Sequence, residues 1–372
     1  MRPPVTSPKV VALCTKAAPF SENQILQREI ARQYPGALWV PELADRLHQR
    51  GIAMVTGDVA LQQVRAGERQ ASEIWVIEED RSFEAEQLIR LGAKGKVLLC
   101  CESPLFAASF YQGLHQTSSN FDHCVVFGGA LKGANPLVKS HSLYFPSFDI
   151  NYRYSDMPWG TRKYLVMVAG NKYWRIRRSP IRQVAAEIRD LVLRRPPRFS
   201  SEYASTQLHD ERLAAISHFG WKGALDLYGS GWGNLNNLPL HWQNELSTTV
   251  SRLNPVPCVD KLETMANYKF ALCFENVGFP GYVTEKVIDC LVAGVVPIYW
   301  GAPDIREFIP ATCFIDARKF SALDALDAHL GKITEVEWAE IVSHGCAFLQ
   351  SIAGQRYSYT GFAERMEAML IG

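Results

Sequence analysis

The polar side chains best suited to chemistry lie between residues 275 and 286, where a predicted buried strand gives way to a predicted helix. Glu275 and Asn276 follow the apolar run at 270–274, and the segment Tyr282-Val283-Thr284-Glu285-Lys286 opens the helix. Open parallel sheets bind ligands outside the carboxyl ends of their strands, which is where this order places the polar residues. The segment therefore predicts a ligand site.

The residue types suggest that this ligand carries an anionic group and hydroxyl groups. A lysine at the start of a helix, such as Lys286, is unfavourable beside the helix dipole unless an anion lies close, and a diphosphate would supply one. Asn276 can donate and accept hydrogen bonds, Glu285 can accept them from sugar hydroxyls, and Tyr282 offers an aromatic face and a hydroxyl. The alternative is an ordinary surface helix start, in which Glu285 complements the dipole and Lys286 is solvated.

A second carboxylate, Glu102, follows the apolar run at 97–101 and precedes Ser103-Pro104, which opens another predicted helix. A carboxylate at the carboxyl end of a buried strand is placed to act as a general base. An acid at a helix N-terminus that is stabilised by the helix dipole is the simpler explanation, and position alone favours it.

Residues 162–198 contain eleven lysines and arginines, opposed only by Glu187 and Asp190. This run predicts an anion site at a helix start or a nucleic-acid patch, with a solvated basic face as the plain alternative. The run Tyr228–Gly233 has the form G-x-G-x-G and differs from the dinucleotide fingerprint. A tight turn with close backbone approach at Gly229 is the favoured interpretation of that motif.

The elements that must position these residues alternate between continuous apolar strands and amphipathic helices, which is typical of parallel sheets covered on both faces. The predicted fold class is α/β, with two Rossmann-like doubly wound domains that face a central cleft. The N-terminal domain is expected at 1–155 and the C-terminal domain at 156–350, joined by a linker at 137–160. A C-terminal helix at 351–372 is expected to pack back on the N-terminal domain. The predicted strands are 9–14, 52–56, 73–77, 96–101, 123–127, 164–168, 224–228, 270–274, 295–299 and 313–315.

Composition narrows the class of protein. The chain has 372 residues, and Lys+Arg 39 against Asp+Glu 38 gives a net charge of +1, so there is no general attraction to nucleic acid or to an anionic membrane. Nine cysteines without a C-x-x-C motif favour reduced, buried thiols, and the histidines show no metal-ligand spacing. The apolar run near the N-terminus is too short for a signal peptide. These features predict a cytoplasmic enzyme without a metal, with at most peripheral contact with the inner membrane.

The segment discussed first closely resembles the α-1,3/1,4-fucosyltransferases of glycosyltransferase family 10, bacterial members above all. The matching residues are Tyr268-Lys269-Phe270, Cys273-Phe274-Glu275-Asn276, Tyr282-Val283-Thr284-Glu285-Lys286 and Pro297-Ile298-Tyr299-Trp300-Gly301. More thinly, Val97–Pro104 resembles the strand that carries the family's base. Ser179-Pro180-Ile181-Arg182 likewise resembles the start of the helix that carries its phosphate-binding arginine.

The resemblance implies a GT-B fold and inverting transfer of fucose from GDP-fucose to a glycan, with no metal or other cofactor required. Under it, Glu102 takes the proton from the acceptor hydroxyl, and Arg182 and Lys286 neutralise the leaving diphosphate. The nucleotide sugar would be held by Asn276, Tyr282, Glu285, Lys286, Arg182, Arg178 and Gly229.

Three departures from the family pattern bear on these roles. Cys101 stands where glycine often precedes the catalytic glutamate, and Val277 stands where Ser or Thr is usual. The basic stretch is longer, so Arg177 or Arg178 can take the place of Arg182.

The expected partners are GDP-fucose and an oligosaccharide or glycoconjugate acceptor containing galactose or N-acetylglucosamine, with no nucleic acid. One alternative is a GT-B transferase that uses another GDP-sugar or an unusual acceptor. An alternative of another class is a non-catalytic protein that binds glycans or nucleic acid. The nearly neutral net charge disfavours the nucleic-acid version.

Overall fold

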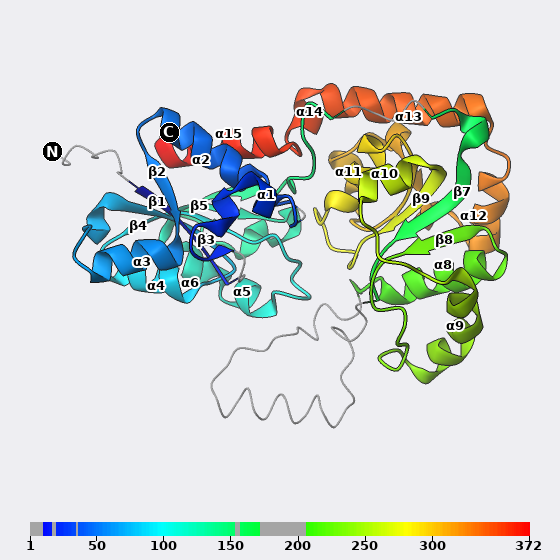
Figure 1. Cartoon of the computed structure of the whole chain (residues 1–372), viewed down its shortest axis with the longest axis horizontal. Coiled ribbons are helices and arrows are strands. Elements are labelled where there is room, and N and C mark those ends of the chain that lie inside the picture. Colours follow the sequence, from blue (N-terminus) through cyan, green and yellow to red (C-terminus); the bar gives the residue numbers. More distant parts are fainter. Residues whose placement is uncertain (1–9, 17–19, 35, 153–156, 172–205) are drawn as a thin grey trace. The chain divides into compact units, whose positions relative to one another are not determined.

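The computed structural model describes residues 10–16, 20–34, 36–152, 157–171 and 206–372. The chain divides into two compact units (Figure 1). Unit 1 comprises Met1–Ile150 together with Gln355–Gly372, and unit 2 comprises Asn151–Gly354.

Among the described residues, unit 1 contains a six-stranded sheet with the order β2-β1-β3-β4-β5-β6. All neighbouring strands pair in parallel. The central strands are apolar and buried on both faces, as a parallel sheet between two helical layers requires. The strands are β1 (Val10–Thr15), β2 (Ala53–Thr56), β3 (Ile74–Glu79), β4 (Lys94–Leu99), β5 (Phe121–Val126) and β6 (Lys139–Ser142).

The helices of unit 1 cover both faces of this sheet, with α2 and α15 on one side and α3 and α4 on the other (Figure 1). The last helix lies against α2, where Trp39 and Phe362 stack edge to face with ring centroids 5.0 Å apart. Glu367 is buried and accepts hydrogen bonds from Arg46 at 2.7 Å and from Arg50 at 2.5 Å. The helices are α1 (Arg28–Ala31), α2 (Trp39–Gln49), α3 (Gly57–Arg65), α4 (Phe83–Arg90), α5 (Ala108–Gln112), α6 (Leu114–Ser118) and α15 (Tyr359–Ile371).

Unit 2 contains, in its described part, a five-stranded parallel sheet with the order β11-β10-β9-β7-β8. Strand β9 is central and lies between β7 and β10, so its carboxyl end is flanked on both sides. The strands are β7 (Lys163–Val168), β8 (Leu225–Tyr228), β9 (Tyr268–Phe274), β10 (Val296–Trp300) and β11 (Ile315–Asp316).

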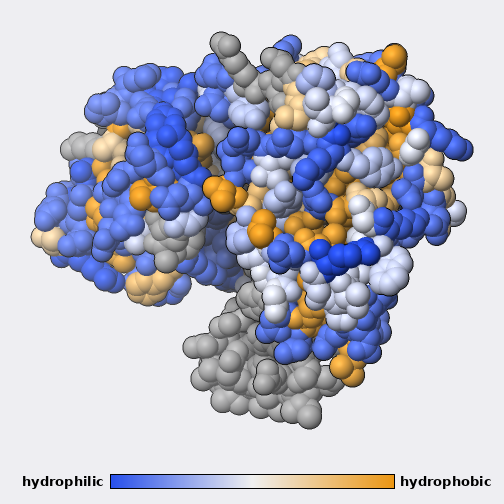
Figure 2. Space-filling model, turned by 45° about the vertical axis from the view of Figure 1, so that its right-hand side comes forward, coloured by the Kyte–Doolittle hydropathy of each residue, from blue (hydrophilic) through white to orange (hydrophobic). Residues whose placement is uncertain are grey.

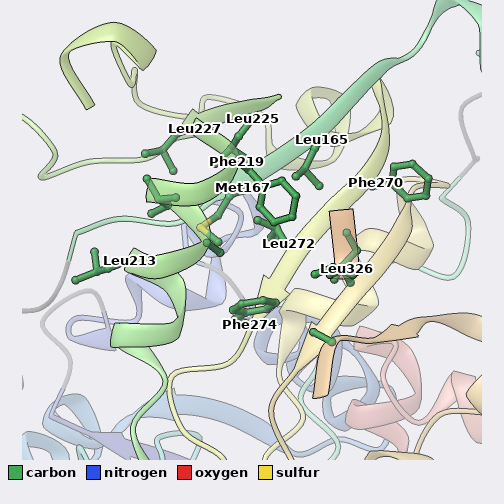
Figure 3. Packing of buried hydrophobic residues seen from close by; sticks show 14 of the residues in the cluster. Leu165, Met167, Leu213, Phe219, Leu225, Leu227, Phe270, Leu272, Phe274 and Leu326 are labelled. Carbon is green, nitrogen blue, oxygen red and sulfur yellow. The ribbon is translucent and has the colours of Figure 1, made fainter. Parts of the chain in front are cut away.

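The helices of unit 2 also lie on both faces of their sheet, with α8 and α9 on one side and α10, α11 and α13 on the other (Figure 1). Figure 3 shows part of the hydrophobic core, where Phe219 of α8 lies near Leu165, Leu225 and Leu272 of the sheet. The helices are α8 (His209–Trp221), α9 (Leu240–Leu253), α10 (Lys261–Ala266), α11 (Glu285–Val292), α12 (Leu323–Leu330), α13 (Glu335–Gln350) and α14 (Ile352–Gln355).

The predicted class, two α/β units with doubly wound parallel sheets, is confirmed. That the two units face a cleft stays a prediction. Three local expectations were wrong or incomplete. The linker expected at 137–160 contains the edge strand β6, whose sequence Lys-Ser-His-Ser carries no apolar signal. The helix predicted to open at Ser103-Pro104 begins only at Ala108 and is divided at Gly113 into α5 and α6. Helices α8 and α9 were not predicted.

The surface of the molecule is mixed in polarity. Figure 2 shows one face, on which hydrophobic patches are interrupted by hydrophilic side chains. Within the described residues, we find no helix that is long and apolar enough to cross a membrane.

Candidate functional site

The centre of the candidate site is Glu275, which follows the last residue of β9 and is fully buried. Its backbone N–H donates to the carbonyl of Trp300 at 2.7 Å, so it still extends the pairing with the β10 side of the sheet. Its carboxylate accepts hydrogen bonds from the backbone N–H of Thr284 at 2.9 Å and from the Thr284 hydroxyl at 2.8 and 2.9 Å. Thr284 is the residue before α11, so this carboxylate lies at the helix N-terminus, where negative charge is favoured.

Lys286, in the first turn of α11, completes this arrangement. Its Nζ donates to Glu275 Oε2 at 3.0 Å and to the Thr284 hydroxyl at 2.9 Å. The Lys286 side chain is 19% exposed. The conflict between this lysine and the helix dipole, which we interpreted as a sign of a diphosphate, is already relieved by Glu275. Lys286 Nζ also lies 3.5 Å from Glu285 Oε1. The dipole argument alone therefore does not require a bound phosphate.

Glu285 is unusually acidic for a carboxyl group whose side chain is only 24% exposed. Burial by itself would raise its pKa, but the positive charges of Lys286 and Lys261 and hydrogen bonds at the helix start outweigh burial and lower the pKa to about 2. Asp289, one turn along α11, accepts a hydrogen bond from Lys261 at 2.6 Å. Burial raises the pKa of Asp289 to about 6 despite that cation. Glu285 is thus a permanent negative charge at neutral pH.

Asn276 is held by two neighbours that fix its orientation. Its Oδ1 accepts a hydrogen bond from the guanidinium of Arg212 at 2.8 Å, and its Nδ2 donates to the Tyr282 hydroxyl at 3.3 Å. Arg212 lies on α8, is buried, and also donates twice to the carbonyl of Phe274, at 2.6 and 3.0 Å. The end of β9 is therefore clamped by an arginine 62 residues away in the sequence.

Gly301 explains how Glu275 can be buried so completely. A Cβ atom at position 301 would lie 2.5 Å from the Glu275 side chain and 2.3 Å from the Tyr299 hydroxyl. That hydroxyl accepts a hydrogen bond from the backbone N–H of Ala302 at 2.9 Å, which holds the loop after β10 in place. Any larger residue at 301 would displace the carboxylate that anchors Lys286.

Gly229 lies in a tight turn after β8, as the favoured interpretation of its motif had it. Its φ is +134°, and a Cβ there would lie 2.4 Å from the carbonyl oxygen of Ala169. The same carbonyl accepts a hydrogen bond from the Trp232 indole at 2.8 Å. The turn therefore joins the loops that follow β7 and β8, and a role of Gly229 in nucleotide binding stays a prediction.

The structure brings Asn276, Tyr282, Glu285 and Lys286 together in one network. The arginines expected to bind phosphate, Arg177, Arg178 and Arg182, lie outside the described residues.

Sequence reasoning missed four members of this network. These are Glu275 as the anchor, Thr284, Arg212 and Lys261. The position of Glu275 directly after a buried strand was a signal for it, but Arg212 gave none, because its role depends on a contact distant in sequence.

In the described part of the site, three cationic side chains are matched by three carboxylates. The cations are Lys286, Lys261 and Arg212, and the carboxylates are Glu275, Glu285 and Asp289. A diphosphate that binds beside them brings additional negative charge. Further positive groups are needed to offset it.

Glu102 lies in unit 1, in the loop after β4. Its carbonyl oxygen accepts a hydrogen bond from the Tyr111 hydroxyl at 2.9 Å. On the neighbouring strand β3, burial raises the pKa of Glu79 to about 7, with Cys101 as its hydrogen-bond partner and the negative charge of Glu102 adding to the shift. Burial also raises the pKa of Glu78 to about 7. Glu78 and Glu79 therefore take up protons at a higher pH than ordinary glutamates do.

The strand of these glutamates ends in a strained turn. Asp80 and Arg81 both have positive φ, at 57° and 54°, which is uncommon for residues other than glycine. Strain of this kind is often found at functional sites.

Residues 207–339, which contain the whole network around Glu275, match the model of glycosyltransferase family 10 (fucosyltransferase), C-terminal part. The match to this family model lies within unit 2. The resemblance given by the motifs is thereby confirmed, and it covers α8 as well, which the motifs had not included.

Curated relatives match over short segments. An α-(1,3)-fucosyltransferase of Helicobacter pylori is 42% identical over 65 residues, which cover 18% of this chain and 14% of the relative. An α-(1,4)-fucosyltransferase of Arabidopsis thaliana is 41% identical over 69 residues, or 18% of this chain and 17% of the relative. The matched part thus spans less than a fifth of either relative's length.

The whole chain is similar in fold to a glycosyltransferase from Rickettsia africae, with a TM-score of 0.57 and 8% identity over 98% of both chains. Together with the two parallel sheets, this similarity confirms the GT-B fold class. Among the described residues we find no group of three or more His, Cys, Asp or Glu side chains arranged to hold a metal ion.

Proposed function

We propose that the protein transfers L-fucose from GDP-fucose, with inversion at the anomeric carbon, to a hydroxyl of a glycan that contains N-acetylglucosamine or galactose. The expected linkage is α-1,3. The observation that carries the proposal is the network around Glu275, Thr284 and Lys286, which lies inside the segment that matches the fucosyltransferase family. The two relatives named above as fucosyltransferases match this chain over 69 and 65 residues.

The donor half of the reaction falls to unit 2. As the bond between the sugar and the diphosphate breaks, negative charge builds on the phosphate oxygens and must be stabilised by fixed cations and by the N-terminus of a helix. Lys286 lies at the start of α11, and Glu275 and Thr284 hold its ammonium in one orientation. Preorganisation of this kind means that the cation does not have to be reoriented during the reaction.

The charge balance of the described network explains why a second cation is needed. Because Lys286, Lys261 and Arg212 are matched by three carboxylates, the diphosphate requires further positive charge. We assign that role to Arg182, with Arg177 or Arg178 as the alternative. The fixed negative charge of Glu285 suits hydrogen bonds from hydroxyl groups of the nucleotide sugar, and Asn276 and Tyr282 add neutral hydrogen-bonding groups.

The acceptor half of the reaction falls to Glu102. Its carboxylate takes the proton from the acceptor hydroxyl while the oxygen forms a bond to the anomeric carbon and the bond to GDP breaks. Inversion requires that the acceptor approaches from the face opposite the leaving group. No metal or other cofactor takes part in the proposed reaction.

The test is to incubate the full chain with GDP-fucose and acceptors of the N-acetyllactosamine type, and to measure both GDP release and GDP binding. We expect release of GDP that depends on the acceptor, and a product in which fucose is attached with inverted configuration. Absence of both turnover and GDP binding would contradict the proposal. A panel of other GDP-sugars decides whether fucose is the preferred sugar, because a transferase for another GDP-sugar would bind GDP but turn over a different donor.

A further inference from the structure

A pocket of about 390 Å³ lies in unit 2, away from the network around Glu275. Apart from Met157, the lining residues all have polar groups in their side chains: Thr161, Lys163, Tyr228, Thr264, Asn267 and Tyr268. Lys163 and Tyr268 are the first residues of β7 and β9, whereas Glu275 follows the last residue of β9. Strand β9 rises about 3.3 Å per residue, so the pocket lies roughly 20 Å from the candidate donor site.

One carboxylate, that of Asp226, binds two of the polar side chains that line this pocket. Asp226 on β8 accepts hydrogen bonds at the same oxygen from Lys163 Nζ at 2.8 Å and from the Tyr268 hydroxyl at 2.6 Å. The Tyr228 and Tyr268 hydroxyls lie 3.2 Å apart, within hydrogen-bond distance. Burial, with the hydrogen bonds to Asp226 and Tyr228, raises the pKa of Tyr268. The Tyr268 hydroxyl therefore stays neutral, and its contacts with Asp226 and Tyr228 fix its position.

The charge of the lining disfavours an anionic ligand. Lys163 is the cation among the described lining residues, and its charge is already matched by Asp226. A phosphate or carboxylate would have to compete with that carboxylate for the ammonium. The lining also disfavours a purely apolar ligand, because Met157 is its one residue without an oxygen or nitrogen in the side chain.

The lining residues still offer a ligand both hydrogen-bond donors and hydrogen-bond acceptors. Asn267 uses Nδ2 to donate to the carbonyls of Glu263 and Thr264, which leaves Oδ1 as an acceptor. The Thr161 hydroxyl donates to Pro158, and its oxygen can still accept. Lys163 has one N–H beyond those directed at Asp226 and Tyr268. Hydroxyl groups, which donate and accept at once, match this set better than groups that do only one.

We propose that this pocket is a binding site for a neutral sugar unit of one or two rings, separate from the donor site. Its volume is at the lower end of the range of about 300–1,000 Å³ for small-molecule sites. The proposal rests on the lining chemistry and does not depend on the transfer activity proposed above.

The test is a ligand-observed NMR titration of the full chain, without nucleotide, using N-acetyllactosamine and lactose as neutral sugars and inorganic phosphate and indole as comparison probes. Thr161 is exposed, so Thr161→Trp should fill the pocket without disturbing the core. Thr248→Trp places the same side chain at an exposed position of α9 that does not line the pocket, and it serves as the matched control. Tyr228→Phe removes one hydroxyl and keeps the ring.

We expect a neutral sugar to bind, with its affinity lowered at least tenfold by Thr161→Trp and about three- to tenfold by Tyr228→Phe, and unchanged by Thr248→Trp. The proposal is overturned if no neutral sugar binds or if sugar binding is insensitive to Thr161→Trp, which would place the sugar elsewhere. It is also overturned if phosphate or indole binds to the protein and Thr161→Trp abolishes the binding of that probe instead of the binding of the sugar. A chain without fucosyltransferase activity that still shows the expected pattern would refute the proposed function and leave this site standing.

Discussion

The carboxyl edges of the two parallel sheets both carry glutamates, but the two edges hold them in opposite ways. In unit 1, burial raises the pKa values of Glu78 and Glu79 to about 7, and neither has a cation in direct contact among the described residues. In unit 2, Lys286 pairs with the buried Glu275, and together with Lys261 it lowers the pKa of Glu285 to about 2.

The same position in the fold therefore holds carboxyl groups in two different electrostatic environments. Carboxyl groups with raised pKa values favour the uptake and release of protons near neutral pH. Carboxylates held by cations are fixed charges, and here they orient an ammonium group at a helix N-terminus. In the proposed division of labour, the base Glu102 lies in unit 1, in the loop after β4, and the diphosphate-binding Lys286 lies in unit 2.

The substitution Glu102→Gln tests the proposed role of unit 1 and should have the largest effect. We expect turnover to fall about 10²- to 10⁴-fold, because the amide cannot take the proton from the acceptor, while GDP binding is unchanged. Steady-state kinetics and calorimetry with GDP measure the two effects. Glu29→Gln, at an exposed position of α1, is the control. Turnover equal to that of the native protein would remove Glu102 from the mechanism.

Lys286→Met tests the other edge. We expect GDP affinity to fall and the free energy of unfolding of unit 2 to fall by about 3 kcal/mol, because the buried carboxylate of Glu275 loses its cation. The double variant Glu275→Gln/Lys286→Met should regain part of the stability but not the GDP affinity, which separates the two roles. Lys222→Met, which breaks an exposed ion pair with Asp324 and Asp327, should leave the free energy of unfolding nearly unchanged. Undiminished GDP binding by a folded Lys286→Met variant would show that Lys286 does not contact the diphosphate.

The two edges should respond to pH in opposite directions. The folded pKa of Glu79, about 7, lies above its unfolded value, so its contribution to stability is full below about pH 4.3 and is lost as the pH rises through 7. The folded pKa of Glu285, about 2, lies below its unfolded value, so its contribution is full above about pH 4.3 and is lost as the pH falls towards 2.

Glu79→Gln should therefore stabilise unit 1 by about 1–2 kcal/mol at pH 8 and leave it unchanged at pH 4. Hydrogen exchange followed by mass spectrometry, with peptides assigned to each unit, measures this directly. Glu29→Gln again serves as the control in unit 1. A stabilisation that is equal at pH 4 and pH 8 would show that Glu79 does not titrate in this range.

Tyr282→Phe should have the smallest effect. It removes the hydroxyl that accepts a hydrogen bond from Asn276, but Arg212 still holds the amide. We expect the Kd for GDP-fucose to rise about two- to fivefold, with little change in kcat. Tyr34→Phe, on the exposed surface of unit 1, is the matched control. A loss of turnover of more than a hundredfold would instead place this hydroxyl at the reacting atoms.

Much of the fold could be predicted because the strands of both sheets are continuous apolar runs. The β9–α11–β10 region was predicted to within one or two residues, since buried strands and a short amphipathic helix leave little ambiguity. Strand β6 was missed because it is a polar edge strand that pairs only with β5. Helix α8 was missed because it buries polar residues, His209 and Arg212 among them, and so lacks a clear apolar stripe.

The site was predictable in part for the same physical reason. Asn276, Tyr282, Glu285 and Lys286 are close in sequence and lie where a strand meets a helix, so their proximity follows from local structure alone. The residues that hold these side chains in place could not be predicted from the local sequence. Arg212 reaches Phe274 and Asn276 from α8, and the burial of Glu275 depends on Gly301 after the next strand. Contacts of this kind arise from tertiary packing, which no local pattern encodes.

The central claim is that the carboxyl edge of the unit 2 sheet holds the nucleotide sugar. Hydrogen exchange of the full chain with and without saturating GDP-fucose tests it most directly, because peptides from 275–292 report on the network itself. We predict slower exchange in this segment when GDP-fucose is bound, and loss of that protection in the Lys286→Met variant. Exchange in 275–292 that is unchanged at a GDP-fucose concentration shown to saturate the protein would contradict the claim.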